Sequence, residues 1–416
     1  MDSEKLKGVI LDQKESMEEL LTRERIIKRD TPFDLSNYLN HPNIIAVLGV
    51  RRCGKSVFSY TLLREILSTF AYINFDDYRL IEFSTSDFEN LLKGFYELYG
   101  DFNYILLDEV QNVNGWERFV SSLRVNKTVI LTGSNSKLLS GELATSLTGR
   151  HVDLVLFPFS FKEFLRYKGK ETHDIFSIKS KSSLKRELEE YLTVGGFPET
   201  VVMGKRVLSS IINDIISKDI IFRYKVAEVN KFKTFAYSII KYYSSEISVR
   251  RMAKMLNIST ATLEKWLNGL RESYLVFMLE RFSRSPKPLN SEKKVYVVDT
   301  GIINNFTVER SVSKLMENVV AIHLLRKNQL EGVSYLKEQE YEVDFVDSVN
   351  RRLVQVSYAS GRDEIKEREI KGLLKGSEVT GYNDLILVSW DYEEELVVEG
   401  DKRVKVVPLW KFLLLY

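Results

Sequence analysis

The chain has 416 residues, of which 44% are hydrophobic and 28% charged, with seven prolines and one cysteine. This composition excludes a disordered chain and an intrachain disulfide framework, and the length predicts two or three domains. The longest apolar runs are far shorter than the roughly 18 residues that cross a bilayer, and the charged N-terminus has no apolar signal segment. We therefore expect a cytoplasmic protein without a membrane partner.

Charge is unevenly distributed along the chain, although the net charge is only +2. Residues 241–294 contain 11 Lys or Arg, 5 Glu and no Asp, whereas the remainder is net negative. A local basic patch is a place where an acidic partner such as DNA binds.

The first 158 residues alternate between helical and strand patterns. Residues 1–30 fit an amphipathic helix and residues 34–40 a short one. Strands are predicted at 44–48, 71–75, 104–108 and 128–132. Helical segments separate them, which indicates a parallel sheet covered on both faces. We predict an α/β nucleotide-binding core over residues 1–158.

The first predicted strand leads into the octapeptide GVRRCGKS, which fits the pattern G-x-x-x-x-G-K-[ST]. In such a loop, backbone N–H groups turn towards phosphate oxygens at a helix N-terminus. Lys55 would reach the β- and γ-phosphates of ATP, and the Ser56 hydroxyl would bind Mg²⁺. Cys53 is either an oxidation switch or a small tolerated loop residue. The predicted nucleotide-binding residues are Gly49, Val50, Arg51, Arg52, Cys53, Gly54, Lys55, Ser56 and Val57.

The third predicted strand ends in the adjacent carboxylates Asp108 and Glu109. After a phosphate loop, such a pair indicates a magnesium site, with Asp108 holding the metal through water and Glu109 polarising the attacking water. A solvated turn is the alternative. Asp76 and Asp77 close the second strand and could join the metal's outer shell or cap a helix.

The fourth strand ends at Ser134 and Asn135, which would lie between the two motif strands and sense the γ-phosphate, or simply form a turn. Arg150 precedes a further strand at 152–158. It could stabilise charge on its own or a neighbouring subunit's γ-phosphate, or be an ordinary surface arginine. The candidate catalytic residues are Lys55, Glu109, Ser134, Asn135 and Arg150, and the candidate metal ligands are Ser56 and Asp108.

Residues 159–235 have helical periodicity and predict a helical lid. Within it, the loop Gly195-Gly-Phe-Pro198 is either a hinge or a plain helix connection.

Residues 236–294 predict a winged helix, because helices at 247–256 and 260–273 flank a short turn and a strand follows at 274–279. Winged helices bind DNA, but they also serve as packing modules. The candidate DNA contacts are Arg250, Arg251, Lys254, Thr260, Thr262, Lys265 and Arg271.

Residues 295–416 predict a second α/β unit. It would begin with a strand at 295–299 and a helix containing Glu317, and its further strands lie near 333–337, 342–346, 353–358 and 384–389.

In this order, the motifs resemble archaeal and bacterial AAA-type ATPases that combine a P-loop domain, a winged helix and a C-terminal domain similar to restriction endonucleases. The motifs that carry the resemblance are 49–56, 107–109, 131–134, 149–150, 157–164, 195–199 and 299–301. The resemblance implies an AAA+-like core that binds and hydrolyses ATP with Mg²⁺, with Arg150 as an arginine finger.

The C-terminal unit resembles the PD-(D/E)xK nuclease fold, in which acidic residues hold magnesium and a lysine assists the attacking water. Glu317, Glu342 and Asp344 fit the first acidic positions, but Gln355 replaces the second carboxylate and Ser357 the lysine. We therefore expect a nuclease-like scaffold without nuclease activity.

Together these patterns predict a magnesium-dependent ATPase whose nucleotide state moves the lid and winged helix and so alters DNA affinity. The alternative is a nucleotide-gated DNA-binding or signalling switch with little turnover. A role in toxin systems or mobile elements rests on analogy alone. A homo-oligomer or a protein partner is compatible with either.

Overall fold

The computed structural model describes residues 1–39, 43–66, 69–136, 151–170, 177–283, 292–307, 310–398 and 402–416. Their contacts divide the chain into two compact units. The first comprises Met1–Phe157 with Glu272–Tyr274, and the second comprises Pro158–Arg271 with Leu275–Tyr416. Within the described ranges, we find no helix with the length and apolar content needed to cross a membrane.

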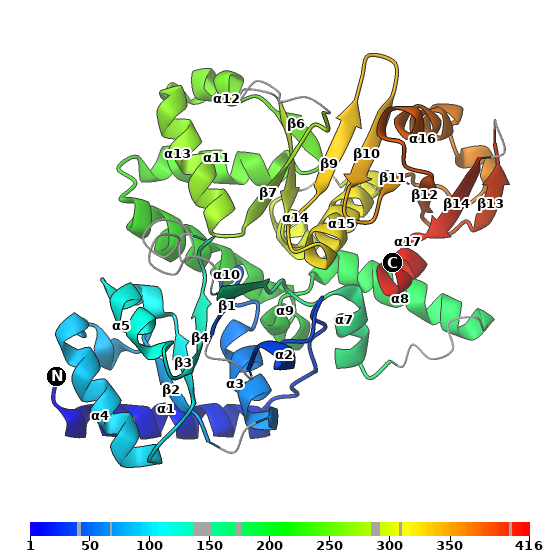
Figure 1. Cartoon of the computed structure of the whole chain (residues 1–416). Coiled ribbons are helices and arrows are strands. Elements are labelled where there is room, and N and C mark those ends of the chain that lie inside the picture. Colours follow the sequence, from blue (N-terminus) through cyan, green and yellow to red (C-terminus); the bar gives the residue numbers. More distant parts are fainter. Residues whose placement is uncertain are drawn as a thin grey trace. The chain divides into compact units, whose positions relative to one another are not determined.

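A five-stranded parallel sheet forms the centre of the first unit, in the order β2-β3-β4-β1-β5 (Figure 1). Its strands are β1 (Ile44–Leu48), β2 (Ala71–Asn74), β3 (Tyr104–Asp108), β4 (Thr128–Gly133) and β5 (His151–Val155). All residues of β1 and β4 are buried, as is usual for parallel strands covered on both faces. The predicted parallel sheet is thus confirmed.

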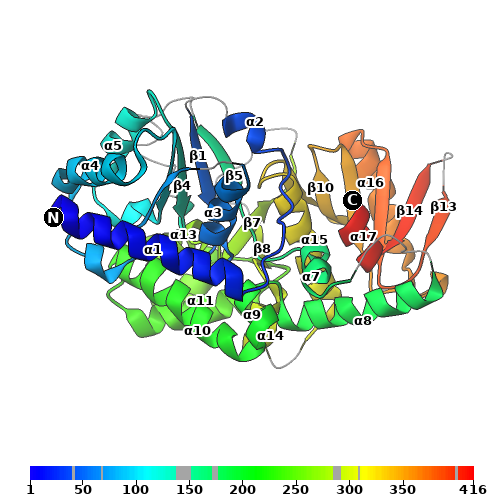
Figure 2. The same cartoon turned by 90° about the horizontal axis from the view of Figure 1, so that it is seen from below.

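Helices cover both faces of this sheet. They are α1 (Ser3–Arg23), α2 (Ser36–Leu39), α3 (Lys55–Ile66), α4 (Phe88–Tyr99) and α5 (Trp116–Leu123), with short 3₁₀ turns η1 (Tyr78–Leu80), η2 (Thr85–Asp87) and η3 (Val110–Asn112). The chain crosses from β1 to β2 and returns through β3 to β4, so right-handed crossovers place α3 on one face and α4 and α5 on the other (Figure 1). Helix α1 packs against α4 and β2 (Figure 2).

The strand order determines where chemistry can occur in the first unit. Strand β4 lies between β1 and β3, so the ends of all three strands meet at one edge of the sheet. This edge carries the phosphate loop, the acidic pair and the Ser134–Asn135 turn. Ligands of open α/β sheets bind at the carboxyl ends of the strands.

The second unit begins with helices, as predicted. They are α7 (Phe161–Tyr167), α8 (Ile178–Val194), α9 (Pro198–Met203), η5 (Lys205–Val207), α10 (Leu208–Asp214), η6 (Ile215–Phe222) and α11 (Val229–Lys241). Within the predicted helical region, the chain changes from α-helix to π-helix at Ile215. Apolar periodicity does not distinguish the two because both bury a similar stripe.

The basic segment contains two helices and three short strands. These are β6 (Ser245–Ile247), α12 (Val249–Leu256), α13 (Thr260–Glu272), β7 (Val276–Glu280) and β8 (Lys293–Val297), with the strands in the order β6-β8-β7. Strand β8 was expected to open the C-terminal unit. Instead it pairs antiparallel with β7 and β6, because the chain reverses after β7 and the returning strand can pair locally.

A six-stranded mixed sheet of order β13-β14-β12-β11-β10-β9 follows. The strands are β9 (Val333–Lys337), β10 (Glu342–Asp347), β11 (Arg352–Val356), β12 (Asp384–Ser389), β13 (Glu394–Val397) and β14 (Arg403–Pro408). The helices of this part are α14 (Thr300–Phe306), α15 (Val312–Lys327), η7 (Arg362–Glu364), α16 (Glu367–Thr380) and α17 (Leu409–Leu415). The four predicted strands of this sheet are present, whereas β13, β14, α16 and α17 were not predicted.

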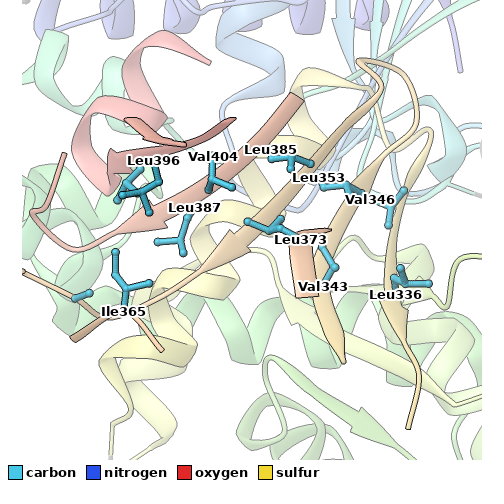
Figure 3. Close-up of a cluster of buried hydrophobic side chains, with 12 residues drawn as sticks. Leu336, Val343, Val346, Leu353, Ile365, Leu373, Leu385, Leu387, Leu396 and Val404 are labelled. Atoms are coloured by element: carbon cyan, nitrogen blue, oxygen red, sulfur yellow. The ribbon is translucent and has the colours of Figure 1, made fainter. Parts of the chain in front are cut away.

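Buried aliphatic side chains hold α16 on this sheet, as Figure 3 shows. Leu373 of α16 packs among Val343, Leu353 and Leu387 from three strands. Gly372 permits the close approach, since a Cβ atom there would lie 2.5 Å from the Glu342 carbonyl oxygen. This packing fixes β10, which carries Glu342 and Asp344.

Candidate functional site

The phosphate loop connects β1 to the N-terminus of α3, as its motif predicts. Arg52 and Gly54 have φ values of 66° and 96°, so the backbone alternates in handedness and its N–H groups can converge into an anion-binding nest. Gly49 is required sterically, because a Cβ atom there would lie 2.1 Å from the Leu156 carbonyl oxygen. Gly49 and the two left-handed residues therefore determine the path of the loop.

Lys55 lies between the phosphate loop and the acidic pair. Its side chain is 3% exposed, its Nζ donates to the Val50 carbonyl oxygen at 3.2 Å, and Nζ lies 3.8 Å from Glu109 Oε1. Ser56 Oγ donates to Asp108 Oδ1 at 2.9 Å. The two sequence motifs therefore meet through side chains of the first turn of α3.

Asp108 is fully buried at the end of β3. Its Oδ1 accepts from Ser56 and from Thr132 Oγ1, whereas its Oδ2 has no hydrogen-bond partner among the described residues. Burial and the charge of Glu109 together raise the pKa of Asp108 to about 6, against the hydrogen bonds from Thr132 and Ser56 and the charge of Lys55, which lower it. A buried carboxylate oxygen without a donor, beside a serine hydroxyl, is a suitable oxygen ligand for Mg²⁺.

Glu109 follows in a left-handed backbone conformation, with φ of 51°. Its backbone N–H donates to Thr132 Oγ1 at 3.0 Å. Gln111 Nε2 and Ser134 Oγ donate to its Oε2, the latter at 3.4 Å. A strained non-glycine residue held by three neighbours is typical of a functional position.

The other predicted nucleotide-site residues have different positions. Ser134 contacts Glu109, and Asn135 is fully buried beside it, so both lie between the motif strands as predicted. Val57 lies in the first turn of α3. Arg150 lies outside the described residues.

The remaining loop side chains mostly contact protein groups. Arg51 Nη1 lies 3.6 Å from Asp76 Oδ2. Asp77 caps η1 and pairs with Arg79, so the capping interpretation holds for Asp77. Cys53 is buried, its Sγ donates to the Leu156 carbonyl oxygen, and burial raises the pKa of its thiol.

Two residues of this site were not predicted. Thr132 contacts both acidic residues, and Gln111 contacts Glu109. Thr132 could have been identified from the strand order, because it lies next to the end of β3 once β4 is placed beside it. Gln111 has no such signal, since its position depends on the turn after β3.

A second group of carboxylates lies in the second unit, on α15 and β10. Glu317, Glu342 and Asp344 surround Lys294 of β8, whose Nζ lies 3.1, 2.7 and 3.4 Å from one oxygen of each. Lys294 is buried. The acidic positions predicted from the nuclease-like pattern thus converge, but they converge on an ammonium group.

Further hydrogen bonds engage the carboxylate oxygens of this cluster. Tyr296 Oη donates to Glu317, and the Val356 N–H donates to Asp344 Oδ2. Gln355 Oε1 accepts from the Asp344 N–H at 3.2 Å. No group of three His, Cys, Asp or Glu side chains in the described ranges is arranged to hold a metal ion.

The charges of this cluster shift the pKa values of Lys294 and Glu317. Burial would lower the pKa of Lys294, but Asp344, Glu317 and Glu342 together raise it, so Lys294 keeps its proton. One ammonium cannot neutralise three carboxylates. Burial, aided by the charge of Asp344, therefore raises the pKa of Glu317 to about 7.

The predicted DNA contacts lie on α12 and α13. Arg250, Arg251 and Lys254 are exposed on α12, and the described residues include no carboxylate ion-paired with them. On α13, Thr260, Lys265 and Arg271 are exposed and Thr262 is partly buried. The Thr262 N–H donates to Ser259 Oγ, so Ser259 caps this helix.

The glycine pair and the Asp-Thr-Gly motif lie together in the second unit. Asp299 Oδ2 accepts from the Gly196 N–H at 2.6 Å, and its Oδ1 accepts from the Gly301 N–H. A Cβ atom on Gly195 would lie 1.9 Å from Asp299. Burial raises the pKa of Asp299 to about 6. These contacts fix the loop in this structure, and its role as a hinge stays a prediction.

Comparison with known proteins gives two domain matches. Residues 41–165 match the family described as AAA domain. Residues 185–313 match a domain of unknown function, DUF8612. The parallel sheet and phosphate loop of the first unit thus match a P-loop AAA core.

Two curated relatives span nearly the whole chain. The uncharacterized protein MJ1544 of Methanocaldococcus jannaschii is 32% identical over 430 residues, which cover 98% of this chain and 95% of the relative. An uncharacterized protein of Haemophilus influenzae is 29% identical, covering 93% of this chain and 98% of the relative.

Solved structures give weaker similarities. The Walker-type ATPase PABY2304 of Pyrococcus abyssi has a TM-score of 0.42 and 15% identity, covering 68% of this chain and 96% of its own. The Orc1 protein of Aeropyrum pernix, solved in complex with DNA, has a TM-score of 0.29 and 14% identity. The match covers 75% of this chain and 93% of the Orc1 chain.

Proposed function

The chain belongs to the same protein family as MJ1544 of Methanocaldococcus jannaschii, and from its phosphate-loop site we propose that it is a magnesium-dependent ATPase. The observation that carries this proposal is the junction of the two motifs. Ser56 of the phosphate loop bonds to Asp108, and Lys55 lies beside Glu109, although more than 50 residues separate the motifs in sequence.

Each residue has a defined task in this proposal. The loop N–H groups and Lys55 bind the phosphates, and Lys55 leaves the Val50 carbonyl oxygen to reach the β- and γ-phosphates. Glu109 orients and polarises the attacking water. Ser134 and Asn135, at the end of β4, contact the γ-phosphate side of the site.

Mg²⁺ fits beside the same residues. Ser56 and Asp108 would hold it together with phosphate oxygens, and Oδ2 of Asp108 accepts no hydrogen bond among the described residues. Mg²⁺ in proteins is usually bound by one or two carboxylates and by substrate phosphates. When bound, the ion neutralises charge on the phosphates.

Steady-state ATP hydrolysis tests the proposal. We expect Lys55→Ala and Glu109→Gln each to lower kcat by at least about 100-fold, since each removes a group that acts on the phosphates or the water. Exposed residues of α4 give matched controls, Lys93→Ala and Glu89→Gln, which should retain wild-type rates. Unchanged turnover in both active-site variants would refute this mechanism.

Arg150 remains a proposed arginine finger that acts within its own subunit or across two. If it acts between subunits, turnover per chain rises with protein concentration, and Arg150→Ala abolishes the rise. Measuring ATPase rate against protein concentration separates the two arrangements.

A nucleotide-gated switch with little turnover is the second candidate. The observation that favours it is the set of contacts on Glu109, whose carboxylate is engaged by Gln111, Ser134 and Lys55 rather than open to water. Tight ATP binding with a turnover of less than one per several minutes, and no stimulation by DNA, would support this candidate over the ATPase.

DNA binding through α12 and α13 is part of the proposal, with nucleotide state altering the affinity. The exposed cations Arg250, Arg251 and Lys254 lie within five residues of each other, which suits contacts to adjacent phosphates. Changing all three to Ala should weaken duplex DNA binding and reduce the slope of log K against log salt by about 2 to 3. A charge-matched control changes Lys366, Arg368 and Lys371, which are exposed at α16.

We further propose that the C-terminal unit is not an active nuclease. Gln355 and Ser357 replace the second carboxylate and the catalytic lysine, and Lys294 occupies the centre of the remaining carboxylates. Incubation of plasmid and linear DNA with the protein and Mg²⁺ or Mn²⁺ tests this. Metal-dependent cutting that Asp344→Asn abolishes would contradict it.

A further inference from the structure

The N-terminal segment between α1 and α2 contacts the phosphate loop from the side opposite its nest. Arg29, in this segment, donates from Nη1 to the Cys53 carbonyl oxygen at 2.9 Å and from Nη2 to the Phe157 carbonyl oxygen at 2.5 Å. One planar guanidinium thus joins the loop to the backbone that follows β5. All three residues belong to the first unit.

The bond to Cys53 has a consequence for the neighbouring peptide. In a planar trans peptide, the carbonyl oxygen and the following N–H point in opposite directions. When Arg29 holds the Cys53 carbonyl oxygen on one side, the Gly54 N–H must point away from Arg29. That N–H belongs to the motif's nest, immediately before Lys55.

The loop needs such an external constraint. Arg52 adopts φ of 66°, a conformation that costs free energy in a non-glycine residue and persists only where the surroundings hold it. The Cys53 peptide is also held by a bond from its own N–H to the Val50 carbonyl oxygen, and its side chain by a bond from Sγ to the Leu156 carbonyl oxygen. Arg29 adds a charged, two-point contact, which is stronger than a neutral hydrogen bond.

We propose that Arg29 is a positioning residue that pre-forms the phosphate-binding nest. It acts through the Cys53 carbonyl oxygen rather than on ATP itself. This inference rests on the proposed function, because it concerns the same nucleotide site, and it assigns to the N-terminal segment a part in phosphate recognition that its sequence does not suggest.

Binding of three ligands tests the proposal. ATP, ADP and inorganic tripolyphosphate all present phosphates to the nest, but tripolyphosphate has no base or sugar. Arg29→Gln should weaken the binding of all three ligands by a similar factor, about tenfold, because each ligand would meet a nest that is no longer pre-formed. The affinity of Arg29→Lys for each ligand should lie between those of Arg29→Gln and the wild type. An ammonium group keeps the charge but cannot donate to both carbonyl oxygens in the geometry of a guanidinium. Arg118→Gln, at an exposed position of α5, is the matched control.

The outcomes separate this inference from the proposed function. If the wild type does not bind ATP, the proposed function fails. If the wild type binds ATP but Arg29→Gln binds ATP and tripolyphosphate within twofold of it, only the positioning role is wrong. A loss confined to ATP and ADP also overturns the role, because it would indicate recognition of base or sugar. If Arg29→Gln does not fold, Arg29→Lys decides by the same criteria.

Discussion

Two regions of this chain gather buried carboxylates around a lysine, and they differ in where the lysine lies. At the phosphate loop, Lys55 lies beside Glu109, 3.8 Å away, and one oxygen of Asp108 has no donor among the described residues. In the C-terminal cluster, Lys294 lies within 3.4 Å of three carboxylates. The first arrangement leaves room for an added cation, whereas the second already contains one.

The difference shows that residue type alone does not define a metal site. Both regions bring acidic side chains close to a lysine, so the residue types alone do not distinguish them. What separates them is the position of the ammonium group, since Lys294 Nζ lies between the three carboxylates, where Mg²⁺ would have to bind, and the two cations repel each other at that distance. The same substitution of Lys55 and of Lys294 should therefore change the unfolding free energy by different amounts.

The largest expected effect is on stability, from Lys294→Met. Removing the ammonium leaves the buried Asp344 and the partly buried Glu317 and Glu342 without their shared counter-cation, and breaking a buried ion pair in this way costs about 3–5 kcal/mol of unfolding free energy. Lys55→Met should cost about 1 kcal/mol or less, because binding-site residues contribute little to stability. Urea unfolding at pH 7.5 measures both.

Lys293 provides the control for this prediction. It is the neighbour of Lys294 in β8 and pairs with Glu280 at 2.6 Å near the surface. Lys293→Met should change the unfolding free energy by less than about 1 kcal/mol, since exposed ion pairs contribute little. Equal effects of Lys294→Met and Lys293→Met would remove the distinction between the two regions.

The second expected effect is on metal affinity. With a non-hydrolysable ATP analogue bound, Mn²⁺ titrated by electron paramagnetic resonance should bind at one site. Asp108→Asn should weaken that binding by about tenfold or more, because it removes the anionic oxygen nearest the ion. Asp344→Asn should leave it unchanged. A second Mn²⁺ that depends on Asp344 would show that the C-terminal cluster takes up metal despite Lys294.

The third expected effect is on the pH dependence of stability. Glu317 has a pKa of about 7 in the folded chain, above its ordinary value of 4.5, so the folded state binds more protons than the unfolded state between these values. The unfolding free energy contributed by Glu317 therefore falls as pH rises from about 4.5 to 7, by about 1–3 kcal/mol. Glu317→Gln cannot titrate and should flatten this part of the profile. Parallel profiles for the wild type and Glu317→Gln would contradict the assignment, and Glu264→Gln, exposed on α13, is the control.

Local patterns predicted where the residues of the first region lie, because short motifs at strand ends place them. The strand–loop–helix context places Lys55 and Ser56, and β3 carries Asp108 to the same sheet edge. Thr132 was not predicted, because its contact with Asp108 depends on which strand lies between β1 and β3. Arg29 was not predicted either, since a side chain that contacts two backbone oxygens leaves no sequence pattern.

The C-terminal region was predicted less completely for a related reason. Glu317, Glu342 and Asp344 were identified as acidic positions, but Lys294 comes from a strand that pairs in a different sheet. Strand pairing between segments is set by tertiary packing rather than by the alternation of residues within each strand. The strand at 295–299 was expected to begin the C-terminal unit without a pairing being predicted for it, and so the contact of Lys294 with the carboxylates was not predicted either.

The smallest expected effect comes from a pair of serines, one in each region. Ser134 Oγ donates to Glu109 at 3.4 Å, so Ser134→Ala should lower kcat for ATP by about 3- to 10-fold with KM within twofold, because a long hydrogen bond contributes about 1 kcal/mol and Gln111 still holds the carboxylate. Ser357 is also buried, at the position predicted to correspond to the lysine of a nuclease, and Ser357→Ala should leave ATP turnover unchanged. Steady-state kinetics of the two variants, prepared in parallel, measure this difference. If Ser357→Ala slowed turnover as much as Ser134→Ala, the effect could not be ascribed to Glu109, and the contact at the end of β4 would have no specific part in catalysis.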